Sequence, residues 1–113
     1  MAEVIYISGP MTGYPGFNYD TFRKAELYLK EHGKTVVSPV ILEEEDTGMP
    51  WLPLYGPYEY YLKQSLVRLL QCNAICMLPG WQLSTGACLE RELAVKLKYT
   101  IYETQYEAVG ITE

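Results

Sequence analysis

The sequence predicts an α/β domain with an open sheet of about four to five parallel strands and helices on both faces. Two observations predict this fold. Short apolar, β-branched segments alternate along the chain with longer segments whose apolar residues recur at helical spacing. The short segments are apolar almost throughout, which is typical of parallel strands covered on both faces. With 113 residues, the chain is predicted to form a single domain over residues 1–113.

The first half of the chain contains two predicted strands and one predicted helix. Residues 3–8 (EVIYIS) are mostly apolar and end at a Gly-Pro turn, so they predict a buried strand. Residues 17–32 predict a helix, with Asn18 as its N-cap and Gly33 just after its end. Residues 34–38 (KTVVS) predict a second strand, which a proline ends.

The second half continues the same alternation. Residues 58–72 predict a helix with leucines along one face, and residues 73–78 (NAICML) predict a third buried strand. Residues 84–99 predict a third helix, and residues 100–103 predict a fourth strand. The alternation is typical of a flavodoxin-like or Rossmann-like fold, and the strand order expected here is the flavodoxin-like order 2-1-3-4. In such open sheets ligands bind beyond the carboxyl ends of the strands.

Two segments carry no regular pattern. Residues 40–57 contain the acidic run EEED and several prolines, and so long a loop in a compact domain is usually functional or mobile. We interpret the acidic run itself as a solvated face. The last ten residues are expected to form a tail or to contribute to a partner subunit.

Composition and charge exclude several classes of function. The net charge of −5 disfavours binding to long nucleic acid or to an anionic membrane. No apolar run approaches the roughly 20 residues of a membrane span, and the first residues lack the pattern of a signal peptide, so the expected compartment is the cytoplasm. Cys72, Cys76 and Cys88 are odd in number and are expected to be reduced core thiols. The single histidine, His32, is expected to cap its helix, which leaves no zinc site.

Glu90 departs from the apolar pattern of the third predicted helix. Helical spacing places it on the same face as Gly86, Leu93 and Leu97, which should face the sheet. Burying an unpaired carboxylate costs several kcal/mol, so such a residue needs a partner, a raised pKa or a cleft. A carboxylate at the helix boundary that reaches solvent is the simpler interpretation from periodicity alone.

Other candidate residues gather where the strands are predicted to end. Ser84 and Gly86 open the third helix, where free N–H groups can approach an anion, although an ordinary N-cap also explains them. The turn at residues 8–13 could cradle a phosphate or simply turn, and it is not a P-loop. Tyr6 could hydrogen-bond to a carboxylate or be one core tyrosine among 11. Trp81 could stack on a base or cover the end of the sheet.

Three segments together resemble the nucleoside 2-deoxyribosyltransferase family and its relatives, the deoxynucleoside monophosphate N-glycosidases and the small members common in bacteriophages. They are IYISGPMTG at residues 5–13, LKEHGKTVVSP at residues 29–39 and NAICMLPGWQLSTGACLERELA at residues 73–94. The resemblance covers almost the whole chain, and it depends on the order and spacing of the three segments.

The resemblance implies roles for individual residues. In that family a tyrosine at a strand end orients a glutamate nucleophile located four residues after a glycine, and Tyr6, Gly86 and Glu90 match these positions. Ser84 matches a serine of the monophosphate glycosidases, where the transferases carry an aspartate. The loop that holds sugar and phosphate is matched by Ser8, Gly9, Pro10, Met11 and Gly13. This loop lacks the arginine of the monophosphate branch, the transferases' second carboxylate has no match, and Asn73 stands where an aspartate is usual.

The implied activity is that of an N-glycosidase or deoxyribosyltransferase acting on a (deoxy)nucleoside or its 5′-monophosphate. The Glu90 carboxylate would attack the anomeric carbon, and water or another base would resolve the glycosyl-enzyme. This chemistry requires no metal and no organic cofactor, and the family implies a homodimer or a higher even homo-oligomer. One alternative is a non-catalytic module of the same fold that binds a nucleotide or nucleotide signal. Another is an interaction protein that uses an apolar patch of tyrosines within residues 55–61.

Overall fold

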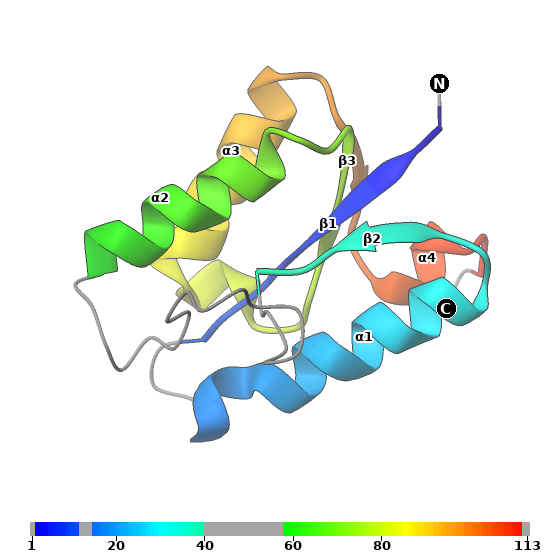
Figure 1. The fold of residues 1–113 in the computed structure, drawn as a ribbon, viewed down its shortest axis with the longest axis horizontal. Helices are drawn as coiled ribbons and strands as arrows, with labels where there is room; N and C mark the ends of the chain where they lie inside the picture. Colours follow the sequence, from blue (N-terminus) through cyan, green and yellow to red (C-terminus); the bar gives the residue numbers. More distant parts are fainter. Residues whose placement is uncertain (1, 12–14, 40–57, 112–113) are drawn as a thin grey trace, which may run out of the picture.

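The computed structural model describes residues 2–11, 15–39 and 58–111 of the chain (Figure 1). The strands are β1 (Val4–Ser8), β2 (Thr35–Val37), β3 (Ala74–Met77) and β4 (Thr100–Tyr102). The helices are α1 (Tyr19–Glu31), α2 (Tyr58–Leu69), α3 (Thr85–Lys96) and α4 (Gln105–Ala108), with 3-10 turns η1 (Pro15–Asn18) and η3 (Trp81–Leu83). Gly13 and the acidic run at 43–46 lie outside the described residues.

The four strands form one parallel sheet in the order β2-β1-β3-β4. This confirms the predicted α/β fold and its strand order. The two central strands, β1 and β3, are buried along almost their whole length. Ser8 pairs with Met77, so these two strands end together at the carboxyl edge of the sheet.

The sheet separates two apolar cores, because successive side chains of a strand point to opposite faces. Ile5 and Ile7 of β1 pack with α1 and with Ala108 of α4. Tyr6 packs on the other face, with residues of α3 and the end of α2. Figure 1 shows this arrangement, with α1 and α4 on one side of the sheet and α2 and α3 on the other. Because Ser8 alternates with Ile7, its side chain lies on the face that α2 and α3 cover.

The C-terminal residues up to 111 do not form the expected tail. They form the short helix α4, which Thr104 caps by accepting a hydrogen bond from the Glu107 N–H at 3.0 Å. Ala108 is 4% exposed and belongs to the core on the α1 face. A helix of four residues is too short to show periodicity, so the sequence pattern could not indicate it.

The two ends of α1 differ in how well the sequence predicts them. Gly33 takes a φ of 80°, and the His32 Nδ1 donates to the Tyr28 carbonyl at 2.8 Å, as expected for the C-terminal end. At the start, Asn18 occupies the N-cap position with a φ of 63°, but its side chain does not cap the helix. Its Nδ2 instead donates to the Pro10 carbonyl at 2.9 Å, which ties the start of α1 to the turn after β1. The helix therefore begins at Tyr19, after the turn η1.

Among the helices of the described ranges, none has both the length and the apolar character needed to cross a membrane.

Candidate active site

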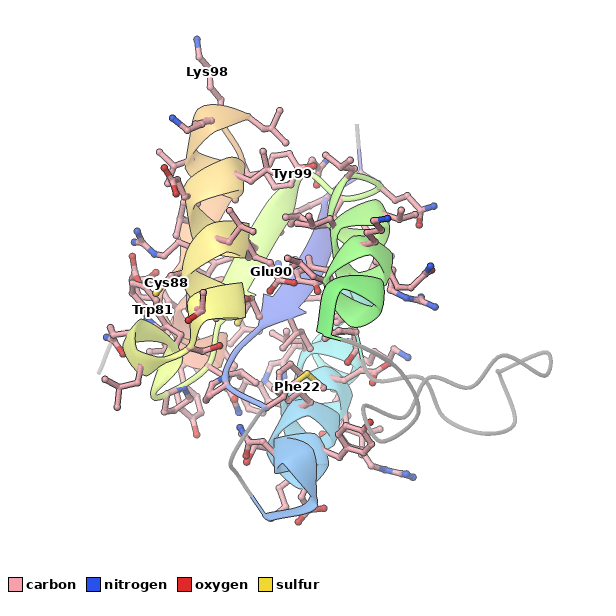
Figure 2. The ribbon with its side chains drawn as sticks, turned by 90° about the vertical axis from the view of Figure 1, so that its left-hand side faces the viewer. Phe22, Trp81, Cys88, Glu90, Lys98 and Tyr99 are labelled. Atoms are coloured by element: carbon pink, nitrogen blue, oxygen red, sulfur yellow. The ribbon has the colours of Figure 1, made fainter. Side chains whose placement is uncertain are left out.

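The centre of the site is the carboxylate of Glu90, which two hydroxyl groups of β1 hold. The Tyr6 hydroxyl donates to Oε2 at 2.8 Å, and the Ser8 hydroxyl donates to Oε1 at 2.6 Å. Tyr6 and Ser8 are alternate residues of one strand, so their side chains lie on the same face of the sheet. Figure 2 shows Glu90 between α3 and α2, over the strands. The structure thus supplies the partners that a carboxylate on the inner face of α3 requires.

The predicted inner face of α3 extends less far than the sequence pattern indicates. Ala87, Glu90 and Ala94 are buried, and Leu93 packs against the same core. Leu97 is 44% exposed, because the helix ends at Lys96 and the chain turns away there. The expectation that Leu97 faces the sheet is therefore wrong.

Burial distinguishes Glu90 from its two partners. Tyr6 and Ser8 have no exposed surface, whereas Glu90 is 7% exposed. The three side chains adjoin an apolar core that includes Ile75, Met77 and other residues on the α2 and α3 face. Of the three residues, Glu90 is therefore the one that solvent still reaches.

The apolar surroundings change the acidity of the site. Burial raises the pKa of Glu90 from 4.5 to about 7, and the hydrogen bonds from Ser8 and Tyr6 partly oppose that rise. Burial and the neighbouring Glu90 raise the pKa of Tyr6 well above 10, while a hydrogen bond with Ser65 of α2 lowers it. Tyr6 thus stays a hydrogen-bond donor at neutral pH, whereas Glu90 exists there in both its ionised and its protonated form.

The end of β1 is fixed against β3. The Leu78 N–H donates to the Ser8 carbonyl at 2.8 Å, which extends the pairing of the two strands. Gly9 follows directly, and a Cβ at this position would lie 2.8 Å from the Leu78 Cβ. That distance is shorter than real Cβ contacts, so the close approach of the two strand ends requires glycine.

The rest of the first turn is only partly described. Pro10 is buried, and its carbonyl accepts the hydrogen bond from Asn18. Met11 is half-buried and packs against the core on the α1 face. The structure therefore brings Ser8 into direct contact with Glu90. Gly9, Pro10 and Met11 instead contact Leu78, Asn18 and the core on the α1 face, respectively.

Ser84 and Gly86 lie at the start of α3. Ser84 is the N-cap, and its Oγ accepts a hydrogen bond from the Ala87 N–H at 3.2 Å. This confirms the N-cap interpretation, and the cap does not use the hydroxyl proton. Gly86 lies in the first turn, four residues before Glu90, which places it about one helical turn away on the same face.

Trp81 does not join the cluster around Glu90. The Arg91 guanidinium lies 4.8 Å from the centroid of its ring, and Arg91 also forms an ion pair with Glu103. Trp81 is half-buried and packs against the core of the α2 and α3 face. Figure 2 shows it on the other side of α3 from Glu90. The sequence allowed Trp81 either to stack on a base or to cover the end of the sheet, and these contacts favour the second interpretation.

The cysteines do not suggest nucleophilic chemistry. All three are free thiols; Cys72 and Cys76 are buried, and Cys88 is half-buried, so the expectation of a core thiol is wrong for Cys88. Burial raises the pKa of Cys72 to about 11 and that of Cys76 to about 12. Within the described part of the chain, no group of three or more His, Cys, Asp or Glu side chains could hold a metal ion.

Asn73 has a structural explanation at the opposite edge of the sheet. Its Oδ1 accepts from the Val4 N–H at 2.7 Å, and its Nδ2 donates to the Ala2 carbonyl at 3.0 Å. An aspartate could not make the second bond in its ionised form, which accounts for an amide at this position. The residue lies before β3, away from the edge where Ser8 ends β1.

The contact between Ser8 and Glu90 is the feature that the sequence did not indicate. The family resemblance implied that Ser8 belongs to a loop that holds sugar and phosphate, whereas its hydroxyl donates to the Glu90 carboxylate. A signal was present, because Ser8 follows Tyr6 by two residues and must share its face of the sheet. What the strand pattern could not supply was the position of α3 over that face.

Comparisons with known proteins agree with this fold. Residues 3–103 match the model of a family described as a domain of unknown function (DUF4406). A search of curated proteins found no match. The solved structure of a 2-deoxyribosyltransferase from the psychrotolerant bacterium Bacillus psychrosaccharolyticus is similar, with a TM-score of 0.62 and 22% sequence identity. The similarity covers 87% of this chain and 69% of that one, and it shows a common fold.

Proposed function

Since this chain belongs to the DUF4406 family and shares its fold with a 2-deoxyribosyltransferase, we propose that it is an N-glycosidase or 2-deoxyribosyltransferase. Its substrate would be a (deoxy)nucleoside or the 5′-monophosphate of one. The observation that supports this proposal best is the buried Glu90 carboxylate, held at both oxygens beside the carboxyl edge of the sheet. Ligands of open parallel sheets bind at that edge.

The proposed reaction has two displacement steps. The ionised Glu90 carboxylate attacks the anomeric carbon, so a C–O bond forms while the C–N bond breaks and its electron pair goes to the base. Water or a second base then attacks the same carbon and releases the carboxylate. When water attacks, it also provides the proton that the departed base gains overall. Two displacements retain the configuration at the anomeric carbon.

Two properties of the site fit this role. The Tyr6 hydroxyl remains protonated, so it can hold the carboxylate in position throughout the reaction. The pKa of Glu90, about 7, means that the ionised nucleophile becomes the major form as pH rises through neutrality. Turnover should therefore increase over that range.

The proposed preference for a 5′-monophosphate depends on Ser84, at the start of α3. Ser84 occupies the position where the monophosphate glycosidases carry a serine, and its hydroxyl proton is not used by the cap. Residues 9–18 and 78–84 contain no lysine or arginine, so a 5′-phosphate would depend on backbone N–H groups and on Ser84. We expect hydrolysis of a deoxynucleoside monophosphate to outrun base exchange.

The decisive experiment compares Glu90→Gln with the control Glu92→Gln, which changes an exposed carboxylate of the same helix. Each protein is incubated with nucleosides and monophosphates, with and without a second base. Free base, exchanged product and the mass of trapped enzyme are followed. Glu90→Gln should abolish turnover, because an amide cannot attack the anomeric carbon, whereas Glu92→Gln should keep it. Tyr6→Phe should reduce turnover by about 10- to 1,000-fold.

Two outcomes would count against the proposal. Undiminished turnover by Glu90→Gln would refute the nucleophilic role. A wild-type protein that binds a nucleotide but turns over no substrate would favour the binding module instead.

We also propose a homodimer or a higher even assembly. Val67 and Leu70, in and just after α2, are 52% and 57% exposed, which would suit contact with a second subunit. The tyrosine side chains within residues 55–61 lie outside the described part. Light scattering should give at least twice the mass of the 12.9 kDa chain, and a monomeric mass would contradict this proposal.

A further inference from the structure

Both oxygens of the Glu90 carboxylate have a hydroxyl donor. The Ser8 hydroxyl is the closer of the two, at 2.6 Å from Oε1, and Tyr6 lies 2.8 Å from Oε2. The terminal torsion of a glutamate is broad, so one hydrogen bond leaves the carboxylate plane free to rotate about it. Two donors on the two oxygens fix that plane.

Ser8 is also held in place by its backbone. It is paired with Met77 of β3, and its carbonyl accepts from the Leu78 N–H at 2.8 Å. Its side chain has no exposed surface. The hydroxyl is therefore directed at Glu90 and shielded from solvent, and the pairing of β1 with β3 fixes the backbone that carries it.

We propose that Ser8 is a positioning residue for the Glu90 carboxylate, which acts together with Tyr6, and that it is not a ligand of the sugar. The proposal rests on the function proposed above. Ser8 holds the carboxylate in one plane for attack, and its donated hydrogen bond favours the ionised form over the protonated form. Loss of this donor should slow the chemical step and leave substrate binding almost unchanged.

Among the residues that the structure describes, few titratable or charged groups surround the Glu90 carboxylate, so a change in its pKa on loss of Ser8 can be attributed to the lost hydrogen bond. β1 contributes Tyr6 as a titratable neighbour, and Cys72, which follows α2, interacts with Tyr6. The sides of β3 and β4 that pack here are apolar, with Ile75 and Met77 from β3 and Ile101 from β4. On α3 itself, Arg91 is paired with Glu103. Burial therefore disfavours the ionised form of Glu90, and the hydrogen bonds from the two hydroxyls favour it.

The test compares Ser8→Ala with Ser8→Thr, which restores a hydroxyl at the same position. In Ser8→Ala, kcat should fall about 10- to 100-fold with KM within about twofold of wild type. The acid limb of the pH profile should move above the wild-type value of about 7, because burial is then opposed by Tyr6 alone. Ser8→Thr should recover both properties. Thr104→Ala is the structural control, since it removes a helix cap on the other face of the sheet and should not move the pH profile.

Two results would overturn the proposal. A raised KM with unchanged kcat would make Ser8 a ligand of the substrate. A lower melting temperature with an unchanged pH profile would make its role purely structural.

A direct titration separates this proposal from the proposed function. The carboxyl carbon of Glu90 can be followed by ¹³C NMR in wild type and Ser8→Ala without any substrate. If wild type turns over nothing, the proposed function fails, but a higher Glu90 pKa in Ser8→Ala would still show that Ser8 holds the carboxylate. An equal pKa in the two proteins would refute the role of Ser8 whatever the activity. Ser8→Cys, which is similar in size but donates weakly, should behave like Ser8→Ala.

Discussion

Replacing Glu90 with glutamine should stabilise the protein above neutral pH and much less in acid. Burial raises the pKa of Glu90 from 4.5 to about 7, so the folded protein binds this proton more tightly than the unfolded chain does. Between these two values the folded state keeps the proton while the unfolded state has lost it. The free energy of unfolding of wild type therefore falls as pH rises through this range.

The expected size of the effect follows from the two pKa values. At about 1.4 kcal/mol per pH unit, a pKa of about 7 in place of 4.5 corresponds to about 3 kcal/mol. The 7% exposure of Glu90 gives solvent little access to screen this penalty. Glutamine is neutral at every pH, so the free energy of unfolding of the variant should not fall in this way as pH rises. For a chain of this length, such a difference is about 10 °C in melting temperature.

Urea unfolding of wild type and Glu90→Gln, at a pH below 4.5 and at a pH above about 7, measures this effect. The quantity of interest is how much the stability difference between Glu90→Gln and wild type changes with pH, because effects of the amide that do not depend on pH then cancel. Glu92→Gln, an exposed substitution on the same helix, should show almost no such change. If the advantage of Glu90→Gln were equal in acid and in base, burial would not control the ionisation of this carboxylate.

Two other predictions follow from the packing. Gly9→Ala should lower the free energy of unfolding by about 1 to 3 kcal/mol, because its Cβ would lie 2.8 Å from the Leu78 Cβ, and an unchanged urea midpoint would contradict this close approach. A thiol reagent at mildly alkaline pH should modify the half-buried Cys88 before the buried Cys76, whose pKa is raised to about 12. Peptide mass spectrometry reads out that order, and equal rates for the two thiols would show that the core opens more readily than the structure indicates.

The sequence predicted the sheet well because its strands are distinct. The runs VIYIS and AICM are mostly apolar and are separated by helices with clear apolar faces, so their type, order and direction could be inferred. The unusual position of Glu90 on an apolar face was also visible. These features depend on local patterns of two to four residues, which a single sequence contains.

Other features depend on contacts that local patterns do not contain. Asn18 could be assigned to the start of a helix, but its bond to Pro10 depends on how the first turn folds back. Helix α4 has only four residues, and its docking depends on the core that Ala108 completes. The second donor to Glu90 required the position of α3 over β1, which no spacing within either segment specifies.

The cluster around Glu90 joins distant parts of the chain. Tyr6 and Ser8 are separated from Glu90 by 84 and 82 residues. During synthesis, β1 emerges long before its carboxylate partner, and until α3 docks on the sheet, Glu90 remains an ordinary hydrated side chain. Local unfolding that detaches α3 would return it to that state. Catalytic competence, under the proposed function, would thus report on the completed tertiary structure, and a partly folded chain would have no reactive carboxylate to expose to other metabolites.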